Sequence, residues 1–531
     1  MTHSRRAALL ALPLLPALML AGAPGAAAQP APKSVLRVAP HADLKSLDPV
    51  HGSILITRMH GLMIYETLFA WDSKLQPQPM MVQDYSVSDD KLVWTFRLRE
   101  GLKFHDGQPV TTKDVIASLK RWMARDTVGV KLAEYTAALE AVDGRSFTLR
   151  LKTATGMVPF ALGSGVGQIP VIMRESDALT DPMKPVTETV GSGPFRFNRG
   201  EWQSGARVVY DRNPDYVPRA EPPDGLAGGR VVKLDRVEWV IMPDAATAAA
   251  AIQTGEIDLW EQPSQDLVPV LARSRDVKVE TYSSLPGQAM LRPNHLHPPF
   301  NDPRARLALA YATDQADFLT AGFGDEKWWR RCDSYFVCGS PNGTEAGAAG
   351  YAKPDLATAR RLLAESGYKG ERVVLTSTYD IAPIGRMAEV AAESLRKAGL
   401  NVDLQFSDWG TVTTRQQNRG TLDQGGWNLF VTFASGATMQ SPITNIGTNM
   451  ACERAWAGWP CDAEAERLRN GVVEAVDAAS QKAATEALHR RLAEVQPYRV
   501  LGQYDQPYAR RSNVSGVLTA PILVFWNIEK K

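Results

Sequence analysis

Few side chains in this sequence have the types and spacing needed for chemistry. The first candidates are an adjacent histidine and aspartate, His105 and Asp106, in the stretch FHDG. An imidazole next to a carboxylate can act as a general base or a metal ligand, but both roles need partners from elsewhere in the chain. Asp106 followed by glycine is typical of a turn, and Thr111 with Asp114 predicts a capping box at a helix start. We therefore interpret His105 and Asp106 as parts of the scaffold.

A second pair of histidines could bind a metal ion. His295 and His297 are separated by one residue, and on a strand two such side chains share a face. No cysteine or carboxylate stands at a matching spacing, so a packing role is favoured over a metal site. The sequence predicts no metal ligands.

Motifs for nucleotide binding or hydrolysis are incomplete or missing. The stretch GSGPF at 191–195 lacks the lysine and the following helix of a phosphate loop. The sequence contains no G-x-S-x-G elbow and no HExxH motif, so no nucleophile or catalytic zinc site can be named. We predict no catalytic residues, no cofactor and no enzymatic activity.

The four cysteines predict disulfides. Their spacing pairs Cys332 with Cys338 and Cys452 with Cys461, and each pair closes a short loop. A four-cysteine zinc site would need CxxC-like clusters, which the sequence lacks.

The N-terminus predicts export. Arg5 and Arg6 precede an apolar stretch at 7–20, and small residues follow it up to Ala28, so residues 1–28 are expected to be a signal peptide. The stretch is too short to span a membrane. No cysteine near the expected cut could carry a lipid, so we predict a free periplasmic protein. The two arginines leave the general and the twin-arginine export routes open.

Charge and size limit the class of protein. Removing Arg5 and Arg6 takes the formal charge from +1 to −1, so no strong field selects nucleic acid or an anionic membrane. About 500 mature residues exceed what one core normally holds, so we expect at least two lobes.

Hydrophobic periodicity predicts an α/β fold that would position any site. Apolar and polar residues alternate at 92–99 and 146–152, as in half-buried strands. Two strand-like segments, 372–379 and 401–409, flank a helical pattern and predict a βαβ unit with parallel strands. Further strands are expected at 34–39, 237–242, 256–262 and 426–433, and a helix at 244–255.

Several phrases occur together in a fixed order: SLDPV, YETLFAWD, VSDDKLVWTFRLREGLKFHDGQPVTTKDV, VGSGPFRF, DRNPDY, AAIQTGEIDL and PPFNDPRARLALAYATDQ. With these motifs the chain resembles the family 5 extracellular solute-binding proteins of ABC importers, which include dipeptide, oligopeptide, nickel and glutathione binders.

The resemblance implies a bilobed periplasmic-binding-protein-like fold with two hinge-linked lobes and an extra N-terminal subdomain. By position, lobe I is expected at 29–290, with the subdomain inserted at about 72–185. Lobe II is expected at 291–497, and 498–531 would return to lobe I. The chain would cross between the lobes near LRPNHL and YRVLGQY.

The implied function is capture of a small solute by hinge closure and its delivery to the transmembrane permease of an ABC transporter. We expect a monomer that does not bind nucleic acid. Two other classes remain open: an exported sensory or chaperone-like binder of a metal chelate or haem, and an exported enzyme on the same fold.

The candidate ligand-binding residues lie at strand ends, where an α/β lobe presents free donors and aromatic walls, except for His51, which lies in the loop after SLDP. They are His51, Trp260, Glu261, Gln262, Trp409, Phe433 and Ser435.

One departure from the peptide-binding relatives concerns the ligand. Their segment after the strand equivalent to WNLFVTF contains a tryptophan and an aspartate that holds the peptide's amino group. Here that segment reads TFASGATMQSP, with Phe433 and no acidic residue up to Pro442. A buried ammonium without a carboxylate is costly, so a peptide with a free N-terminus would need Glu261 as a substitute. Otherwise we expect a blocked or modified peptide, a metal chelate, or another small organic solute, such as an aromatic or acidic one.

Overall fold

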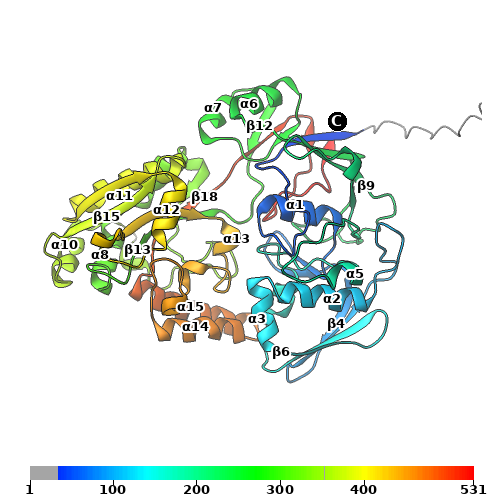
Figure 1. The fold of residues 1–531 in the computed structure, drawn as a ribbon, viewed down its shortest axis with the longest axis horizontal. Helices are drawn as coiled ribbons and strands as arrows, with labels where there is room; N and C mark the ends of the chain where they lie inside the picture. The colour runs from blue at the N-terminus through cyan, green and yellow to red at the C-terminus, as the bar shows by residue number, and fades with distance from the viewer. Residues whose placement is uncertain (1–33, 352) are drawn as a thin grey trace, which may run out of the picture. The chain divides into compact units, whose positions relative to one another are not determined.

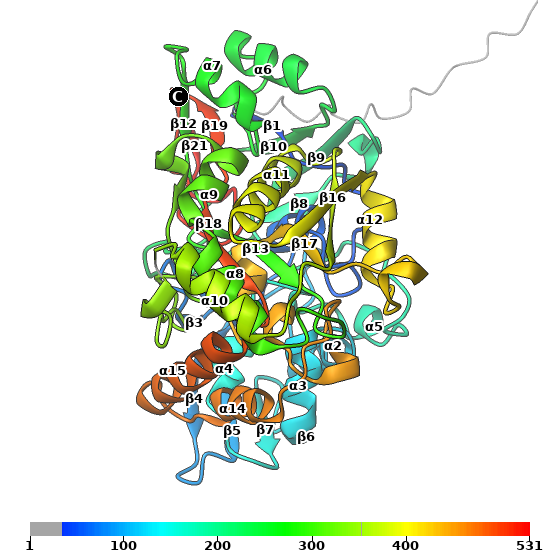
Figure 2. The same cartoon turned by 90° about the vertical axis from the view of Figure 1, so that its left-hand side faces the viewer.

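A computed structural model describes residues 34–351 and 353–531, and the predicted signal peptide at 1–28 lies outside these ranges. The described chain is built on two large sheets, each with its own helices (Figures 1 and 2). No helix among the described residues is both long and apolar enough to cross a bilayer.

The first sheet has seven strands in the order β12-β19-β11-β1-β10-β9-β8. At its centre β1 runs parallel to β10 and β11, and the remaining pairs are antiparallel. The predicted strands at 34–39 and 237–242 are confirmed, whereas only Leu259–Trp260 of the strand predicted at 256–262 form one. The bounds are β1 Val35–Ala39, β8 Phe195–Phe197, β9 Arg207–Arg212, β10 Arg236–Val240, β11 Leu259–Trp260, β12 Val277–Glu280 and β19 Tyr508–Arg511.

Helix α6, Ala245–Thr254, connects strands of the first sheet, where a helix is predicted at 244–255. It begins after Asp244, whose side chain accepts a hydrogen bond from the Thr247 amide. It stops at Gly255, which adopts the left-handed conformation that favours glycine. Helix α1, Leu55–Ile64, is almost entirely buried.

The second sheet has six strands in the order β14-β18-β13-β17-β15-β16. The predicted βαβ unit is confirmed, because helix α11, Ala382–Lys397, joins the parallel strands β15 and β16. Strand β13 is buried at every residue and pairs with β17 and β18. The bounds are β13 Gly287–Pro293, β14 Trp329–Arg330, β15 Arg372–Thr378, β16 Asn401–Ser407, β17 Leu429–Ala434 and β18 Arg499–Tyr504.

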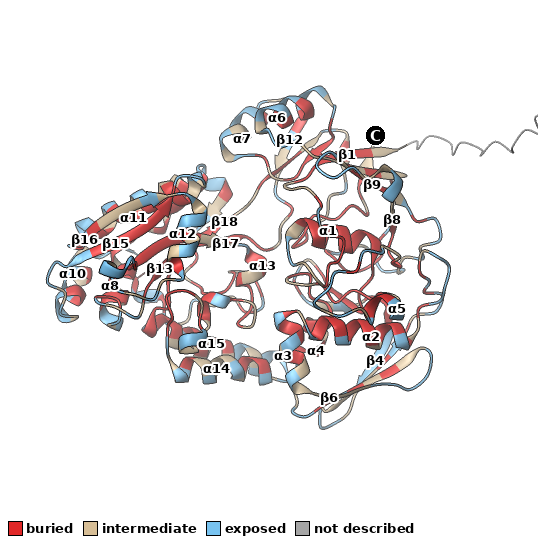
Figure 3. Cartoon of the chain, in the orientation of Figure 1, coloured by how far each residue is buried: buried red, intermediate tan, exposed pale blue. Residues whose placement is uncertain are grey.

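Each large sheet contributes to a hydrophobic core, and the buried strands appear in Figure 3. The core of the second sheet is closed by helices with apolar faces. These are α8 Pro303–Ala312, α9 Gln315–Phe323 and α10 Leu356–Glu365, together with α11.

A smaller antiparallel sheet, β4-β5-β7-β6, is inserted in the sequence between strands of the first sheet. Its helix α2 begins with the predicted capping box, in which the Asp114 carboxylate accepts from the Thr111 amide. The elements are β4 Val82–Val87, β5 Val93–Leu98, α2 Thr112–Met123, α3 Thr127–Tyr135, β6 Thr136–Ala141 and β7 Ser146–Leu151.

The chain passes twice between the two large sheets, through two crossing segments at 281–286 and 505–507. They lie slightly away from the expected boundaries at 290/291 and 497/498, because β13 and β18 belong whole to the second sheet. The stretch LRPNHL therefore does not cross between the sheets. The division into lobes at 29–290, 291–497 and 498–531, with an insertion at about 72–185, remains our proposal.

Candidate solute-binding site

A buried carboxylate lies where two parallel strands of the first sheet end. Glu261 directly follows β11 and is 0% exposed. Its Oε2 accepts from the amide of His41, at 3.0 Å, and lies 2.8 Å from His41 Nδ1. His41 follows β1, the parallel neighbour of β11, so sheet geometry brings the two residues together. The other oxygen of Glu261, Oε1, is buried and has no hydrogen-bond partner among the described residues.

Tyr282 connects this carboxylate to the first crossing segment. Its side chain is buried, and it lies beside Glu261, Gln262 and Arg58. Burial raises the pKa of Tyr282 well above its ordinary value, and the charge of Glu261 adds to the shift. The phenol therefore stays protonated at neutral pH and can donate a hydrogen bond.

Arg58, on helix α1, is a buried cation at the same place. The residue is 9% exposed, and its Nη1 donates to the carbonyl of Gly165 at 3.3 Å. Its Nε is buried without a partner, and no carboxylate of the described residues forms an ion pair with it. Burial lowers the pKa of Arg58 to about 10, so the guanidinium remains charged at neutral pH.

The end of β17 in the second sheet supplies two further predicted residues. The ring of Phe433 packs edge-on against Tyr504, with centroids 5.5 Å apart, and against Phe323. Ser435 is exposed and caps the short helix α13, Gly436–Met439. Phe433 thus belongs to an aromatic cluster of the protein itself, and only part of its surface is open.

Helix α13 abuts the first crossing segment. A Cβ at Gly436 would lie 2.2 Å from the carbonyl oxygen of Pro286 and 2.5 Å from that of Leu285. Only glycine fits such an approach, which brings the end of β17 next to the segment that carries Tyr282.

The remaining predicted residues have varied surroundings. Trp260 packs in an apolar cluster of the first sheet and is 6% exposed. His51 is half-buried, and its Nδ1 has no partner among the described residues. Trp409 begins helix α12, Trp409–Gln416, and its amide donates to Asp380. Gln262 is half-buried beside Tyr282.

The predicted ligand residues fall into separate groups. Trp260, Glu261 and Gln262 are consecutive, and Phe433 and Ser435 are neighbours on β17 and α13. Among the described residues, no hydrogen bond or ring contact joins the first group to the second. Their common role in binding one solute remains a prediction.

The sequence analysis missed three residues of this site: His41, Tyr282 and Arg58. For Arg58 there was a signal, because the stretch ILITRMHGLMI is otherwise mostly apolar and a charged residue there needs a reason. His41 and Tyr282 carry no comparable local signal. They join the site only because β1 and the first crossing segment lie next to the end of β11.

The histidines considered for metal or acid–base chemistry serve the scaffold. The ring of His105 contacts the Gly193 carbonyl, and Asp106 pairs with Arg174. His295 and His297 follow β13 instead of lying on a strand, so the condition for a shared metal site is not met. Their rings contact two different carbonyls, those of Pro497 and Arg419.

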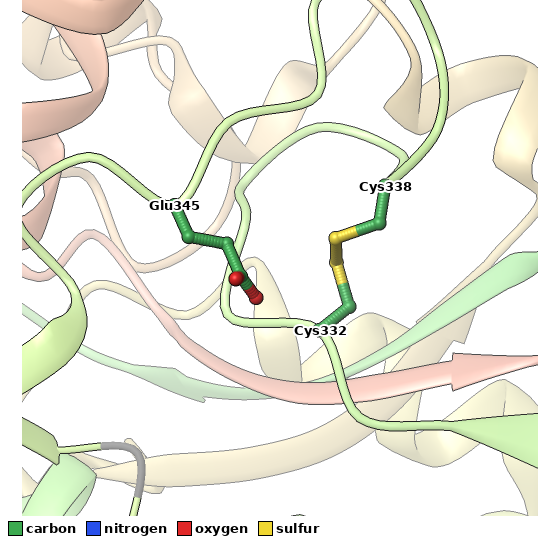
Figure 4. A group of neighbouring side chains, drawn as sticks. All are labelled: Cys332, Cys338 and Glu345. Atoms are coloured by element: carbon green, nitrogen blue, oxygen red, sulfur yellow. A yellow bond between two sulfur atoms is a disulfide. The ribbon is translucent and has the colours of Figure 1, made fainter.

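Both predicted disulfides are confirmed, Cys332–Cys338 and Cys452–Cys461. Figure 4 shows the carboxylate of Glu345 close to the first of them. The two sulfurs are bonded to each other, so they offer no thiolates for a metal ion.

A cavity of ≈ 310 Å³ lies away from the strand ends. It is lined by the inserted region, including Phe160, and by helices α14, Ala463–Glu474, and α15, Ala478–Val495. Its walls mix apolar and polar side chains and contain none of the predicted ligand residues. The buried charges at the strand ends are therefore the better candidate site.

The whole fold and sequence are similar to those of solute-binding proteins. Residues 76–450 match the bacterial extracellular solute-binding proteins, family 5 middle region. A probable peptide ABC transporter periplasmic-binding protein, y4tO of Sinorhizobium fredii, is 38% identical over 492 residues, 92% of each chain. The oligopeptide-binding protein AppA of Bacillus subtilis is 25% identical, over 88% of this chain and 86% of that protein.

The crystal structure of the ABC transporter substrate-binding protein CtaP from Listeria monocytogenes has the same fold. It superimposes with a TM-score of 0.79 at 18% identity, over 93% of this chain and 99% of that one. The predicted α/β fold of two hinge-linked lobes is thus confirmed. The chain belongs to family 5 of the bacterial extracellular solute-binding proteins, the solute-binding components of ABC importers.

Proposed function

We propose that this protein is exported to the periplasm, binds a peptide-like solute as a monomer without turning it over, and delivers it to an ABC permease. The observation that carries the choice of a peptide-like solute is the buried carboxylate of Glu261. One of its oxygens accepts no hydrogen bond from the part of the chain that the structure describes, and relatives of the chain are named as peptide-binding proteins.

Glu261 is suited to hold the amino group of such a solute. The segment after β17 lacks an acidic residue, so the ammonium would need its partner elsewhere. Glu261 is held in place through Oε2 by His41, and the Tyr282 hydroxyl lies beside the carboxylate. Oε1 accepts no hydrogen bond from the described residues, so it can accept one from the solute. A charged hydrogen bond of this kind adds about 1.5–3 kcal/mol to binding.

We further propose that Gln262, His51 and Trp260 contact the solute from the first lobe, and Trp409, Phe433 and Ser435 from the second. A ligand that touches both lobes stabilises the closed conformation, because it makes all its contacts only there. Rotation at 281–286 and 505–507 would allow the closure.

Native mass spectrometry of the protein without its signal peptide, mixed with a pool of tripeptides, tests the choice of solute. We expect adducts of tripeptide mass that are absent under denaturing conditions, and a smaller radius of gyration by X-ray scattering with the pool. Unchanged mass and unchanged compactness would contradict the proposal.

A variant pair tests the role of Glu261. Glu261→Gln should weaken binding of tripeptides by about tenfold or more, since the charge partner of the ammonium is lost. N-acetylated tripeptides should bind both proteins alike. Glu256→Gln, an exposed position just before β11, is the matched control and should bind as the unchanged protein does.

A further inference from the structure

Among the described residues, Arg58 uses fewer donors than the other deeply buried arginines. Arg230 comes nearest to it, with two hydrogen bonds of 3.4 Å and an Nε without a partner, but it lies near the charge of Glu66. Arg292 donates to four backbone carbonyls, Arg306 to three, and Arg121 to three carbonyls and the carboxylate of Asp48. Arg58 makes a single side-chain hydrogen bond, and it is long.

An arrangement of this kind is costly unless something else binds the free donors. A buried charge without a partner lowers stability by several kcal/mol. The Nε and Nη2 groups of Arg58 have no partners among the described residues, and together they form one edge of the planar guanidinium. That edge has the geometry that binds the two oxygens of a carboxylate side by side.

The position of Arg58 connects it to the candidate site. Burial raises the pKa of Tyr282, whereas the charge of Arg58 lowers it, and Tyr282 lies beside Glu261 and Gln262. Tyr282 belongs to the first crossing segment, against which α13 of the second sheet packs. A group bound to Arg58 would therefore lie where the two sheets are joined.

We propose that Arg58 binds a carboxylate of the solute. The inference rests on the proposed function and narrows its substrate class to solutes with a carboxylate. Among the described residues, Arg58 forms no ion pair with a carboxylate, so its buried positive charge is available to the ligand. A single charge fits a carboxylate better than a phosphate dianion. With Glu261 also near Tyr282, the site complements a zwitterion.

The test compares two pools of the same tripeptides, one with free carboxyl termini and one amidated. Binding is measured by native mass spectrometry and by titration, on the unchanged protein and on three variants. Arg58→Met keeps much of the length of the side chain without its charge. Arg58→Lys keeps the charge without the two parallel N–H donors of the guanidinium. Arg361→Met removes an exposed arginine of α10 and serves as the control.

We expect the unchanged protein and Arg361→Met to bind the free-acid pool at least tenfold more tightly than the amides. Arg58→Met should lose that preference, and Arg58→Lys should keep part of it. The comparison of the two pools on the unchanged protein does not depend on the folding of any variant. Inorganic phosphate should not displace the free-acid tripeptides.

Other outcomes overturn the inference in distinguishable ways. If both pools bind equally to every protein, peptide binding stands and the role of Arg58 is wrong. If phosphate displaces the peptides, Arg58 belongs to a phosphate site instead. If neither pool binds the unchanged protein, the proposed peptide-like solute is wrong, and the inference about Arg58 is refuted with it.

Discussion

Two buried arginines, one beside each large sheet, show how differently the molecule treats a charge inside the protein. Arg292, on β13 of the second sheet, is 0% exposed and all three of its nitrogen groups donate to carbonyls. Its guanidinium also stacks near the ring of Trp456. Arg58, on α1, is nearly as buried and uses one donor.

The contrast separates a structural charge from one available to a ligand. Arg292 joins segments that are far apart in the sequence, since its acceptors are Gly447, Trp456, Ala457 and Pro497. Arg58 joins almost nothing within the protein. A buried charge is tolerated when its hydrogen bonds are complete, so the incomplete one is the better indicator of a binding site.

The largest effect is expected for Arg292→Met. The substitution leaves four carbonyl oxygens without their donor, which should lower the free energy of unfolding by about 3–5 kcal/mol. Urea unfolding followed by circular dichroism measures the loss, with Arg361→Met as the control. A loss below 1 kcal/mol, or one equal to that of Arg58→Met, would contradict the view that Arg292 is structural and Arg58 is not.

Removing the disulfide next to Arg292 should have a smaller effect. Cys452–Cys461 closes the loop that contains the carbonyls of Trp456 and Ala457. Replacing both cysteines with alanine should cost about 2–3 kcal/mol, because the unfolded loop gains freedom.

When the substitution of Cys452 and Cys461 is combined with Arg292→Met, the free energy of unfolding should fall by less than the sum of the two separate losses. Both changes loosen the same loop. Replacing Cys332 and Cys338 is the matched control, because this disulfide lies outside the loop. If the losses are additive when Arg292→Met is combined with removal of either disulfide, Cys452–Cys461 does not support the carbonyls around Arg292.

Acid should destabilise the part of the chain that precedes the second sheet, because it contains a buried and a half-buried histidine, His60 and His105. Burial lowers the pKa of His60, on α1, to about 3 and that of His105 to about 4. Both are neutral in the folded protein at pH 5 but bind protons on unfolding, so stability is present above pH 6.5 and lost as the pH falls. At pH 5 the loss is about 2 kcal/mol for each histidine.

Urea unfolding at pH 7 and pH 5 measures this dependence. In His105→Asn the difference between the two pH values should shrink by about 2 kcal/mol, because one of the titrating groups is gone. A difference as large as in the unchanged protein would mean that His105 is already protonated in the folded state.

The smallest effect on stability is expected for Arg58→Met. Few hydrogen bonds are lost and a buried unpaired charge is removed, so the free energy of unfolding should change by less than about 1 kcal/mol, or rise. Urea unfolding in the absence of solute gives the value. A loss as large as that of Arg292→Met would show that Arg58 has a structural role.

Much of the fold could be predicted from the sequence because it depends on short-range patterns. The capping box of Thr111 and Asp114, the βαβ unit around α11 and both disulfides follow from spacings of a few residues up to one helix. The crossing segments were less well placed. β13 and β18 are buried strands that could pair in either sheet, and only their partners show to which sheet they belong.

The chemical types and many local elements were determined by the sequence alone: a glutamate at the end of a strand, an arginine in an apolar stretch, and an α/β order of elements. Only the tertiary structure decided which charges have partners. Glu261 meets His41 across 220 residues, and Arg58 meets Gly165 across 107. Helix and strand patterns act over a few residues, whereas the hydrogen bonds of a buried charge depend on segments that folding brings together from distant parts of the chain.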